Sequence, residues 1–436
     1  MKFFLKGKDN ILSKGLASTG IKVLGAFSSY VLSFLIAKKF GAEGNGVFAL
    51  FMTYTVILST FFYLGLDFFL VKQISVLMKQ KNYLEIKKVY DKIIYNYIIP
   101  VSVIIVAVGI SLYLYLSQTL VIMVACGVII NVYIDINSAV FRGMKMAEWY
   151  SFFVQFSKHF TTVVLFLLLI LNDQPESIVL VYLSSLIING ILSFFILNKT
   201  LGKLPKTESF IAKLDYSLIS ILKTSKEFFF ASIIVITMVW IDFILIDMFL
   251  DETTAGVYSI ALKLSTLISF GFTAFNAFLA PRISEIYFEG SPQKLQRLLS
   301  QNFVLIFPTL LFPFLGILFF NQQLLSFFGS EFKSGWVILL LLTAGQFINS
   351  LFGPVSLLLQ MTNYQKIFQN ILLFVFAFKL ISALIFVKIW GAEGIAFASF
   401  VGLSLWACIG SYFVYKKLGI YSWFSLKEIK SIYFNS

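Results

Sequence analysis

Charged residues are scarce in this sequence, and histidine and cysteine are almost absent. Lysine, arginine, aspartate and glutamate make up 13% of the 436 residues, and there are one histidine and two cysteines. Because soluble domains contain about 25% charged residues, this composition excludes an ordinary soluble protein. One histidine and two cysteines are too few for the usual zinc sites. Cys126 and Cys408 lie within apolar runs and are expected to be small buried side chains, not a disulfide.

Sites for nucleotide hydrolysis and for covalent chemistry are also missing. The sequence contains no Walker-type phosphate-binding loop and no connection long enough to form a separate catalytic domain. We therefore expect a protein that is not an enzyme and that uses no cofactor and no metal.

Apolar runs fill most of the chain. Hydrophobic residues make up 59% of it, and the mean hydropathy is +0.90. A helix that crosses a bilayer needs about 20 mostly apolar residues. The sequence therefore predicts an all-α, polytopic membrane protein with twelve transmembrane helices, at 15–37, 46–69, 92–116, 119–140, 149–171, 177–197, 226–250, 255–279, 301–320, 335–358, 366–389 and 394–415.

Lysines and arginines are concentrated on one side of these spans. Most of the 34 lie before the first span, in the connections that follow even-numbered spans, or after the last span. The positive-inside rule places this side, with both termini, in the cytoplasm. Topology therefore explains the net charge of +13, and we expect no nucleic acid partner. Patches such as KQKNYLEIKK could also attract anionic lipid head groups.

The chain contains a weak internal repeat with a shift of 210 residues. The segment that begins GVFALF at Gly46 aligns with the one that begins GVYSIA at Gly256, and Lys72 aligns with Arg282. We interpret the repeat as two six-helix lobes, although two apolar spans can also align this loosely by chance. Lobes that enter the membrane in the same direction leave a central cavity that can open to either side. The expected boundaries are 1–197 and 226–418 for the lobes, 198–225 for a basic cytoplasmic linker, and 419–436 for a cytoplasmic tail.

The tetrapeptide GAEG occurs twice, at 41–44 and 391–394. We expect each copy to form a tight outer turn, in which the first glycine adopts the left-handed conformation that ends a helix. Its glutamate would lie near the N-terminus of the next helix, where the helix dipole favours a carboxylate. The copies join different hairpins, spans 1–2 and spans 11–12, so they are not partners in the repeat.

Four lysines lie deep within the spans. An ionisable group near the bilayer centre costs about 2.5–3.5 kcal/mol on insertion scales and usually faces the protein interior or water. Lys22 and Lys263 could extend toward an interface, whereas Lys158 and Lys379 are too deep for that. We predict that all four are substrate-binding cations of the cavity.

Two further groups are candidates for ion coupling, Asp242 and His159. Asp242 either pairs with a lysine on a facing helix or binds a coupling ion. The single histidine could carry a proton or could serve only as a hydrogen-bonding group. Asp67 and Asp135 lie near span ends and are expected at the interface. Because four lysines oppose a single deep acid, the cavity would suit an anion, and lysine is a phosphate binder.

Several segments resemble the Wzx-type polysaccharide flippases, also called O-antigen transporters. In FGAEGNGVFALFMTYTVILSTFFYLGLDFFLVKQIS a glycine-rich turn leads into a span that ends in Gly65-Leu66, followed by Lys72 where arginine is common in the family. AVFRGMKMAEWYSF at 139–152 resembles the family's returning Arg-Gly turn, and LLLQMTNYQKIF at 357–368 holds the matching place in the second half. The multidrug/oligosaccharidyl-lipid/polysaccharide exporter superfamily shares the twelve-span, two-lobed plan.

The resemblance implies a substrate and a cavity. It implies that an undecaprenyl-pyrophosphate-linked oligosaccharide is flipped from the cytoplasmic to the periplasmic leaflet of the bacterial inner membrane. It also implies that spans 1, 2, 7 and 8, which contain Lys22, Asp242 and Lys263, line the cavity. Lys158 and Lys379 do not fall on a family motif.

We therefore expect a flippase for O-antigen or a similar repeat unit. It would work by alternating access in the lipid bilayer, with H+ or Na+ as the coupling ion and alongside other polysaccharide assembly proteins. Two alternatives are open. A multidrug efflux antiporter of the same superfamily would suit cationic drugs, against which a lysine-rich cavity argues. A membrane enzyme of glycan assembly would need a long outer loop with catalytic side chains, which this sequence lacks.

Overall fold

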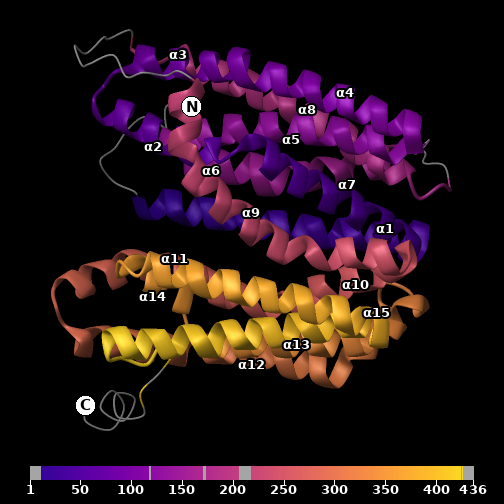
Figure 1. The fold of residues 1–436 in the computed structure, drawn as a ribbon, viewed down its shortest axis with the longest axis vertical. Coiled ribbons are helices and arrows are strands. Elements are labelled where there is room, and N and C mark those ends of the chain that lie inside the picture. Colours follow the sequence, from indigo (N-terminus) through magenta and orange to yellow (C-terminus); the bar gives the residue numbers. More distant parts are fainter. Residues whose placement is uncertain (1–10, 117–118, 170–172, 206–217, 424, 426–436) are drawn as a thin grey trace. The chain divides into compact units, whose positions relative to one another are not determined.

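The protein is helical throughout its described part. A computed structural model describes residues 11–116, 119–169, 173–205, 218–423 and 425, and all regular structure in these residues is helical (Figure 1). The earlier helices are α1 (Ile11–Tyr63), α2 (Leu66–Lys79), α3 (Tyr83–Ile93), η2 (Ile94–Ile98), α4 (Ile99–Leu116), α5 (Thr119–Gly143), α6 (Ala147–Ser151), η3 (Phe152–Ser157), α7 (Lys158–Leu168) and α8 (Ser177–Leu201). The later ones are α9 (Leu218–Phe249), α10 (Glu252–Ser265), α11 (Leu267–Phe288), α12 (Pro292–Ser326), η4 (Ser330–Gly335), α13 (Trp336–Leu351), α14 (Val355–Met361) and α15 (Gln365–Leu418).

Ten helical stretches of the described residues are long and apolar enough to cross a membrane. Two of them, in α1 and α15, have the length of two spans, and each is broken at a glycine, Gly41 or Gly391. These two helices therefore supply two spans each, and the described chain has the twelve spans that the sequence predicts. The expected fold class is confirmed.

The two breaks are the first glycines of the GAEG turns. Gly41 has φ 66° and ψ −156°, and Gly391 has φ 58° and ψ −134°. The positive φ agrees with the expected turn, but the ψ values are far from the left-handed helical value of about +47°. A backbone with positive φ and extended ψ is essentially restricted to glycine, which explains why glycine stands at both breaks.

The chain forms two compact units. The first comprises Met1–Phe40 and Phe51–Thr237, and the second comprises Gly41–Leu50 and Met238–Ser436. The boundary between them falls inside α9. Residues 206–217, at the centre of the linker expected at 198–225, lie outside the described residues, as do residues 424 and 426–436 of the expected tail.

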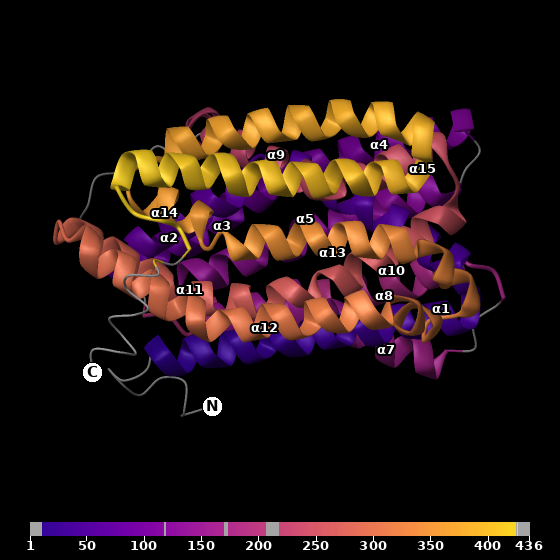
Figure 2. The same cartoon turned by 90° about the horizontal axis from the view of Figure 1, so that it is seen from below.

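Each unit is built around one central helix. In the first unit α5 packs against α2, α4, α6 and α8. In the second unit α13 packs against α10, α11, α12 and α15. Figure 2 shows the two arms of α15 lying side by side after the chain reverses at Gly391. Helix α5 carries Asn131 and Asp135, and the folded α15 carries Lys379 and Ser399, which are described below.

Matching turns precede the fifth and eleventh spans. Lys145 has φ 61° and Asn363 has φ 65°, and α6 and α15 begin two residues later, at Ala147 and Gln365. Positive φ is uncommon for residues other than glycine, but Lys81 also has it, two residues before α3. The turns before the fifth and eleventh spans are therefore alike in local geometry.

Candidate functional site

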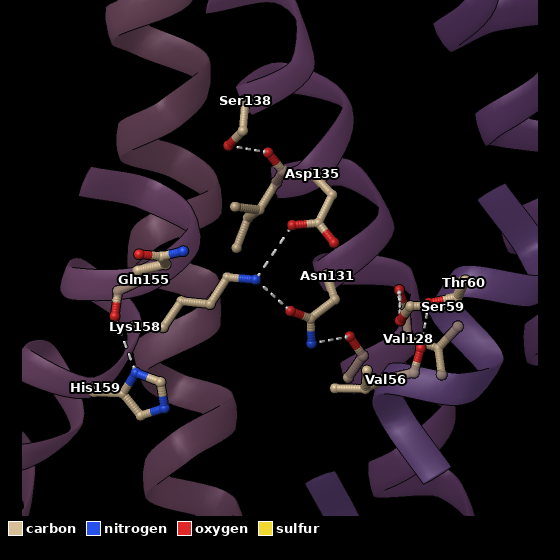
Figure 3. Close-up of polar contacts among 12 residues, drawn as sticks. Val56, Ser59, Thr60, Val128, Asn131, Asp135, Ser138, Gln155, Lys158 and His159 are labelled. Atoms are coloured by element: carbon tan, nitrogen blue, oxygen red, sulfur yellow. Dashed lines mark hydrogen bonds and ion pairs between the residues drawn. The ribbon is translucent and has the colours of Figure 1, made fainter. Parts of the chain in front are cut away.

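Lys158 is held by two side chains of α5 (Figure 3). Its Nζ donates a hydrogen bond to Asn131 Oδ1 at 2.7 Å and lies 3.4 Å from Asp135 Oδ1. Asn131 and Asp135 are one helical turn apart and therefore share a face of α5. The Lys158 side chain is 8% exposed and that of Asp135 is 29% exposed. This ion pair is buried at its ammonium and partly open at its carboxylate.

The π-helical turn η3 immediately precedes Lys158. A π turn inserts a residue into a helix and disturbs the regular backbone bonding, and such turns are frequent at functional sites. Here side chains bond the nearby carbonyls: the hydroxyls of Thr162 and Ser185 both donate to the Lys158 carbonyl, at 2.6 and 2.8 Å. A Cβ at Gly25 of α1 would lie 2.6 Å from the Gln155 carbonyl oxygen. Glycine at this position therefore lets α1 pack directly on the π turn.

His159 follows Lys158 but points elsewhere. Its Nδ1 lies 3.1 Å from the Gln155 carbonyl oxygen. Because a carbonyl can only accept, Nδ1 carries the hydrogen in this bond. Figure 3 shows the imidazole directed away from Asn131 and Asp135. The structure thus gives His159 a hydrogen-bonding role and does not bring it into the Lys158 ion pair.

A second ion pair, between Lys379 and Asp242, lies in the second unit. The lysine Nζ is 3.0 Å from Asp242 Oδ1 and donates to the Met238 carbonyl oxygen at 2.8 Å. The other carboxylate oxygen accepts hydrogen bonds from the Tyr258 and Ser399 hydroxyls, both at 2.7 Å. Sequence reasoning left open whether Asp242 pairs with a lysine or binds an ion, and the structure shows the lysine pair.

The reversal of α15 at Gly391 positions this second pair. Lys379 lies on the first arm of α15 and Ser399 on the second, so the turn brings both to Asp242 of α9. Gly402 lies opposite the lysine stem, because a Cβ added there would be 3.4 Å from the Lys379 Cβ. Glycine at position 402 leaves room for the Lys379 side chain to pass the second arm of α15 and contact Asp242.

The two buried lysines occupy related places in the repeat. Both lie on the helices that begin after the matching turns, Lys158 on the fifth span and Lys379 on the eleventh. We count each lysine from the first residue of its helix, α6 or α15, and leave out the extra residue that the π turn inserts before Lys158. Lys379 then lies about one helical turn further along its helix than Lys158 does. Each unit therefore neutralises a lysine from the equivalent helix with a carboxylate of its own.

Lys22 and Lys263 belong to neither ion pair. Lys22 is exposed on α1, and Lys263 is half-buried in the last turn of α10. Of the six side chains predicted as site residues, Lys379 and Asp242 pair with each other in the second unit, and Lys158 pairs with Asp135 in the first.

Sequence reasoning missed four partners of the buried lysines and the buried acid: Asn131, Asp135, Tyr258 and Ser399. The four-residue spacing of Asn131 and Asp135 within one span was a usable signal, because it places two polar side chains on one helix face. Asp135 was expected at the interface; in the structure it pairs with Lys158, and its side chain is 29% exposed. Nothing in the sequence singled out Ser399, which is one of many serines in the spans.

Asp67 lies at the start of α2, just beyond the end of the apolar stretch at Tyr63. Burial raises the pKa of its carboxyl from 3.8 to about 6. Hydrogen bonds from the Phe68 backbone and the Tyr63 side chain oppose this rise, as does the charge of Arg142, whereas the charge of Asp135 adds to it. Asp67 is therefore a group that titrates in a mildly acidic range.

Comparisons with known proteins agree with this fold. Residues 11–287 match the profile of a family described as polysaccharide biosynthesis proteins. The probable low-salt glycan biosynthesis flippase Agl15 of Haloferax volcanii is 22% identical over 395 residues, which cover 88% of this chain and 80% of that protein.

Two solved structures share the architecture. An inward-facing multidrug resistance MATE family transporter aligns with a TM-score of 0.67 at 15% identity, covering 93% of this chain and 98% of its own. The lipid II flippase MurJ, in an inward closed conformation, aligns with a TM-score of 0.61 at 16% identity, covering 97% of this chain and 90% of its own. At these identities the likeness concerns the fold.

Proposed function

We propose that this chain, which belongs to the polysaccharide biosynthesis protein family, is a flippase that moves a lipid-linked oligosaccharide between membrane leaflets. The family match over residues 11–287 carries this proposal. Two similar proteins support it, since the relative from Haloferax volcanii is named a probable glycan biosynthesis flippase and MurJ is named a lipid II flippase. The direction would be from the cytoplasmic to the periplasmic leaflet of a bacterial inner membrane, with both termini in the cytoplasm.

The substrate we propose is an undecaprenyl-pyrophosphate-linked repeat unit of O-antigen or a similar surface polysaccharide. Its pyrophosphate needs cations along the path, and lysine binds phosphate as a point charge. Lys22, exposed on α1, and Lys263 on α10 are the first candidates. Lys158 can join them, because its partner Asp135 is partly exposed and a phosphate can replace a carboxylate as the acceptor of the ammonium. Lys379 is exposed to the same extent as Lys158, at 8%, but its partner Asp242 is only 3% exposed.

For the coupling ion we propose a proton taken up by Asp242. The carboxylate of Asp242 is surrounded by donors, namely the Lys379 ammonium and the Tyr258 and Ser399 hydroxyls. A metal cation such as Na+ needs oxygen ligands, and here an ammonium already occupies the place beside the carboxylate. Protonation of Asp242 would remove the charge that holds Lys379, which makes the pair sensitive to the proton gradient. His159 is a weaker candidate, because its ring is directed away from Asp135.

The direct test is a deletion strain complemented with the wild-type gene. The proposal expects lipid-linked repeat units to accumulate on the inner leaflet of the deletion strain, and surface polysaccharide to return on complementation. Normal surface polysaccharide in the deletion strain would contradict the proposal. Purified protein in vesicles that contain the lipid-linked oligosaccharide should then move it between leaflets, faster with a proton gradient than without one.

Multidrug efflux is the second candidate, and one observation favours it. Two of the four lysines are paired with carboxylates, Asp135 and Asp242. The excess of lysines over acids is therefore two, and not the three counted from the sequence, which weakens the argument against cationic drugs. The MATE transporter that shares the fold is described as a multidrug resistance protein. Increased drug susceptibility in the deletion strain, with intact surface polysaccharide, would favour this function over the first.

A further inference from the structure

A groove runs between the two arms of α15 on the surface of the second unit. Its volume is about 360 Å³, and the side chains that line it are Ile367, Asn370, Ile371, Phe374, Ile409 and Phe413. Five of the six are apolar, and Phe374 is 56% exposed. Sites for small ligands have volumes of about 300–1,000 Å³. Because both arms of α15 span the membrane, this groove is open to lipid.

The reversal at Gly391 brings the two ends of α15 to the same end of the unit. The arms, 365–390 and 392–418, are almost equal in length and lie side by side (Figure 2). The first turn of the first arm and the last turn of the second arm therefore flank the same end of the groove.

Three lysines lie at this end. Lys366 precedes Asn370 by four residues on the first arm, and Lys416 and Lys417 follow Phe413 by three and four residues on the second. Residues three or four apart share a helix face, so each arm continues its groove-lining face with a cation. All three lysines are exposed.

No carboxylate of α15 balances these charges at this end. Glu393 is the one acidic residue in α15, and it lies beside Gly391 at the opposite end. The helices α13 and α14, which pack against α15, contain no charged residue. Membrane topology accounts for lysines at this end of the spans, but it does not account for their position at the mouth of a groove.

The depth of the polar groups along the groove matches that of a phospholipid. At about 1.5 Å per residue the first arm is about 39 Å long, close to the thickness of about 40–45 Å of a bilayer with its head groups. Lys366 then lies among the head groups, and Asn370 lies one turn deeper, at the glycerol. On the second arm the Lys416 Nζ is 5.8 Å from the centre of the Tyr412 ring, and Tyr412 is 58% exposed. Tyrosine is enriched at the membrane interface.

We propose that this groove binds one anionic phospholipid. Its phosphate would lie at Lys366, Lys416 and Lys417, and an acyl chain would lie along the apolar lining. Lysine binds phosphate as a point charge, and basic pockets between transmembrane helices bind anionic lipid head groups. A polar side chain that faces lipid is costly without a partner, and the ester oxygens of the lipid would accept from the Asn370 amide. The proposal does not depend on which molecule the protein transports.

The affinity for phosphatidylglycerol tests the role of the three lysines. Native mass spectrometry of the purified wild-type protein, titrated with this lipid in detergent, should show one tightly bound molecule. The combined variant Lys366→Gln, Lys416→Gln and Lys417→Gln should bind it about 100-fold more weakly, since each lysine at a membrane surface contributes about fivefold.

A matched variant removes the same charge from the first unit. Lys79, Lys87 and Lys92 are also exposed, and their combined change to glutamine should leave the affinity of the tight site unchanged. Equal weakening by the two triple variants would mean that phosphatidylglycerol is attracted by basic surface in general, and it would overturn the proposal.

Filling the groove tests the position of the acyl chain without a change of charge. Asn370→Trp places a large ring in the groove and should abolish tight binding of phosphatidylglycerol. Leu373→Trp is the control, because Leu373 is 47% exposed on the same arm but does not line the groove. If Asn370→Trp binds the lipid as well as Leu373→Trp does, the groove is not the site.

Two other lipids identify the occupant. Phosphatidylcholine has the same acyl chains but no net charge, so it should not displace phosphatidylglycerol from the wild-type protein. Displacement by an equal amount of phosphatidylcholine would contradict recognition of the anionic head group. Displacement by an equal amount of undecaprenyl phosphate would assign the groove to the lipid carrier of a glycan, and it would overturn the assignment to a phospholipid.

Discussion

Lys379 and Asp242 neutralise each other inside the second unit, with an Nζ–Oδ1 distance of 3.0 Å and side chains that are only 8% and 3% exposed. In such surroundings each charge depends on the other, because an unpaired buried ion has a large desolvation cost. The pair thus explains how a lysine can be tolerated near the middle of the eleventh span.

The pair predicts a specific pattern of stability. Asp242→Asn or Lys379→Leu alone should lower the free energy of unfolding by about 3–5 kcal/mol, because each leaves a buried group without its partner. The double variant should recover much of this loss, because both charges are gone. Thermal unfolding of the purified variants in detergent measures the effect.

Transport should behave differently from stability in these variants. The double variant is expected to fold at normal levels and yet to lose the stimulation of translocation by a proton gradient, since its coupling carboxylate is absent. A double variant that still responds to the gradient would show that the ion is bound elsewhere.

The Lys158 site should be more tolerant. Asp135 is 29% exposed, and Asn131 keeps its hydrogen bond to Lys158 after Asp135→Asn. The loss of stability should therefore fall below that of Asp242→Asn, at about 1–3 kcal/mol. Lys158→Ala should reduce export of the glycan at normal protein level. Unchanged export by both Lys158→Ala and Lys379→Ala, with normal amounts of each protein in the membrane, would remove these lysines from the mechanism.

The contrast between the two sites shows what the sequence can reveal. Twelve spans follow from length and hydropathy, which are local properties, and the depth of Lys158 and Lys379 follows from their position within a span. Their partners follow only in part. The sequence offered a lysine pair as one possibility for Asp242, but Ser399 reaches Asp242 only after α15 reverses at Gly391. A pairing across helices depends on packing that no single segment encodes.

The identical GAEG turns make the same point. Both first glycines have positive φ, as the sequence predicts. Yet Gly41 lies beside the Glu331 carboxylate, whereas the neighbour of Gly391 is the Leu250 side chain. The positive φ was predictable from four residues, whereas the extended ψ was not, and the role of each turn depends on the surface it meets.

Gly25 should be far less tolerant of substitution than Gly20, although both lie in α1. A Cβ at Gly25 would be 2.6 Å from the Gln155 carbonyl oxygen, whereas nothing lies within 4 Å of a Cβ at Gly20. Gly25→Ala should therefore cost about 1–3 kcal/mol through overpacking, and Gly20→Ala should be neutral or stabilising, since alanine favours the helix. Thermal unfolding of the two variants decides this, and equal behaviour would mean that α1 does not pack on the π turn.

Asp67 predicts a change of stability with pH in the mildly acidic range. Burial raises the pKa of its carboxyl from 3.8 to about 6, so the folded protein binds the proton more tightly than the unfolded chain does. The contribution of Asp67 to stability is then fully present below pH 3.8 and is lost as the pH rises through about 6. Asp67→Asn stays neutral at every pH and should remove this loss. The melting temperature of the wild type, measured from pH 4 to pH 7, should therefore fall relative to that of Asp67→Asn.

Glu85→Gln, which changes the exposed ion pair with Lys88, is a control that should follow the wild type. Parallel curves for wild type and Asp67→Asn would show that this carboxyl ionises as it does in water, and that its surroundings at the start of α2 are open to solvent.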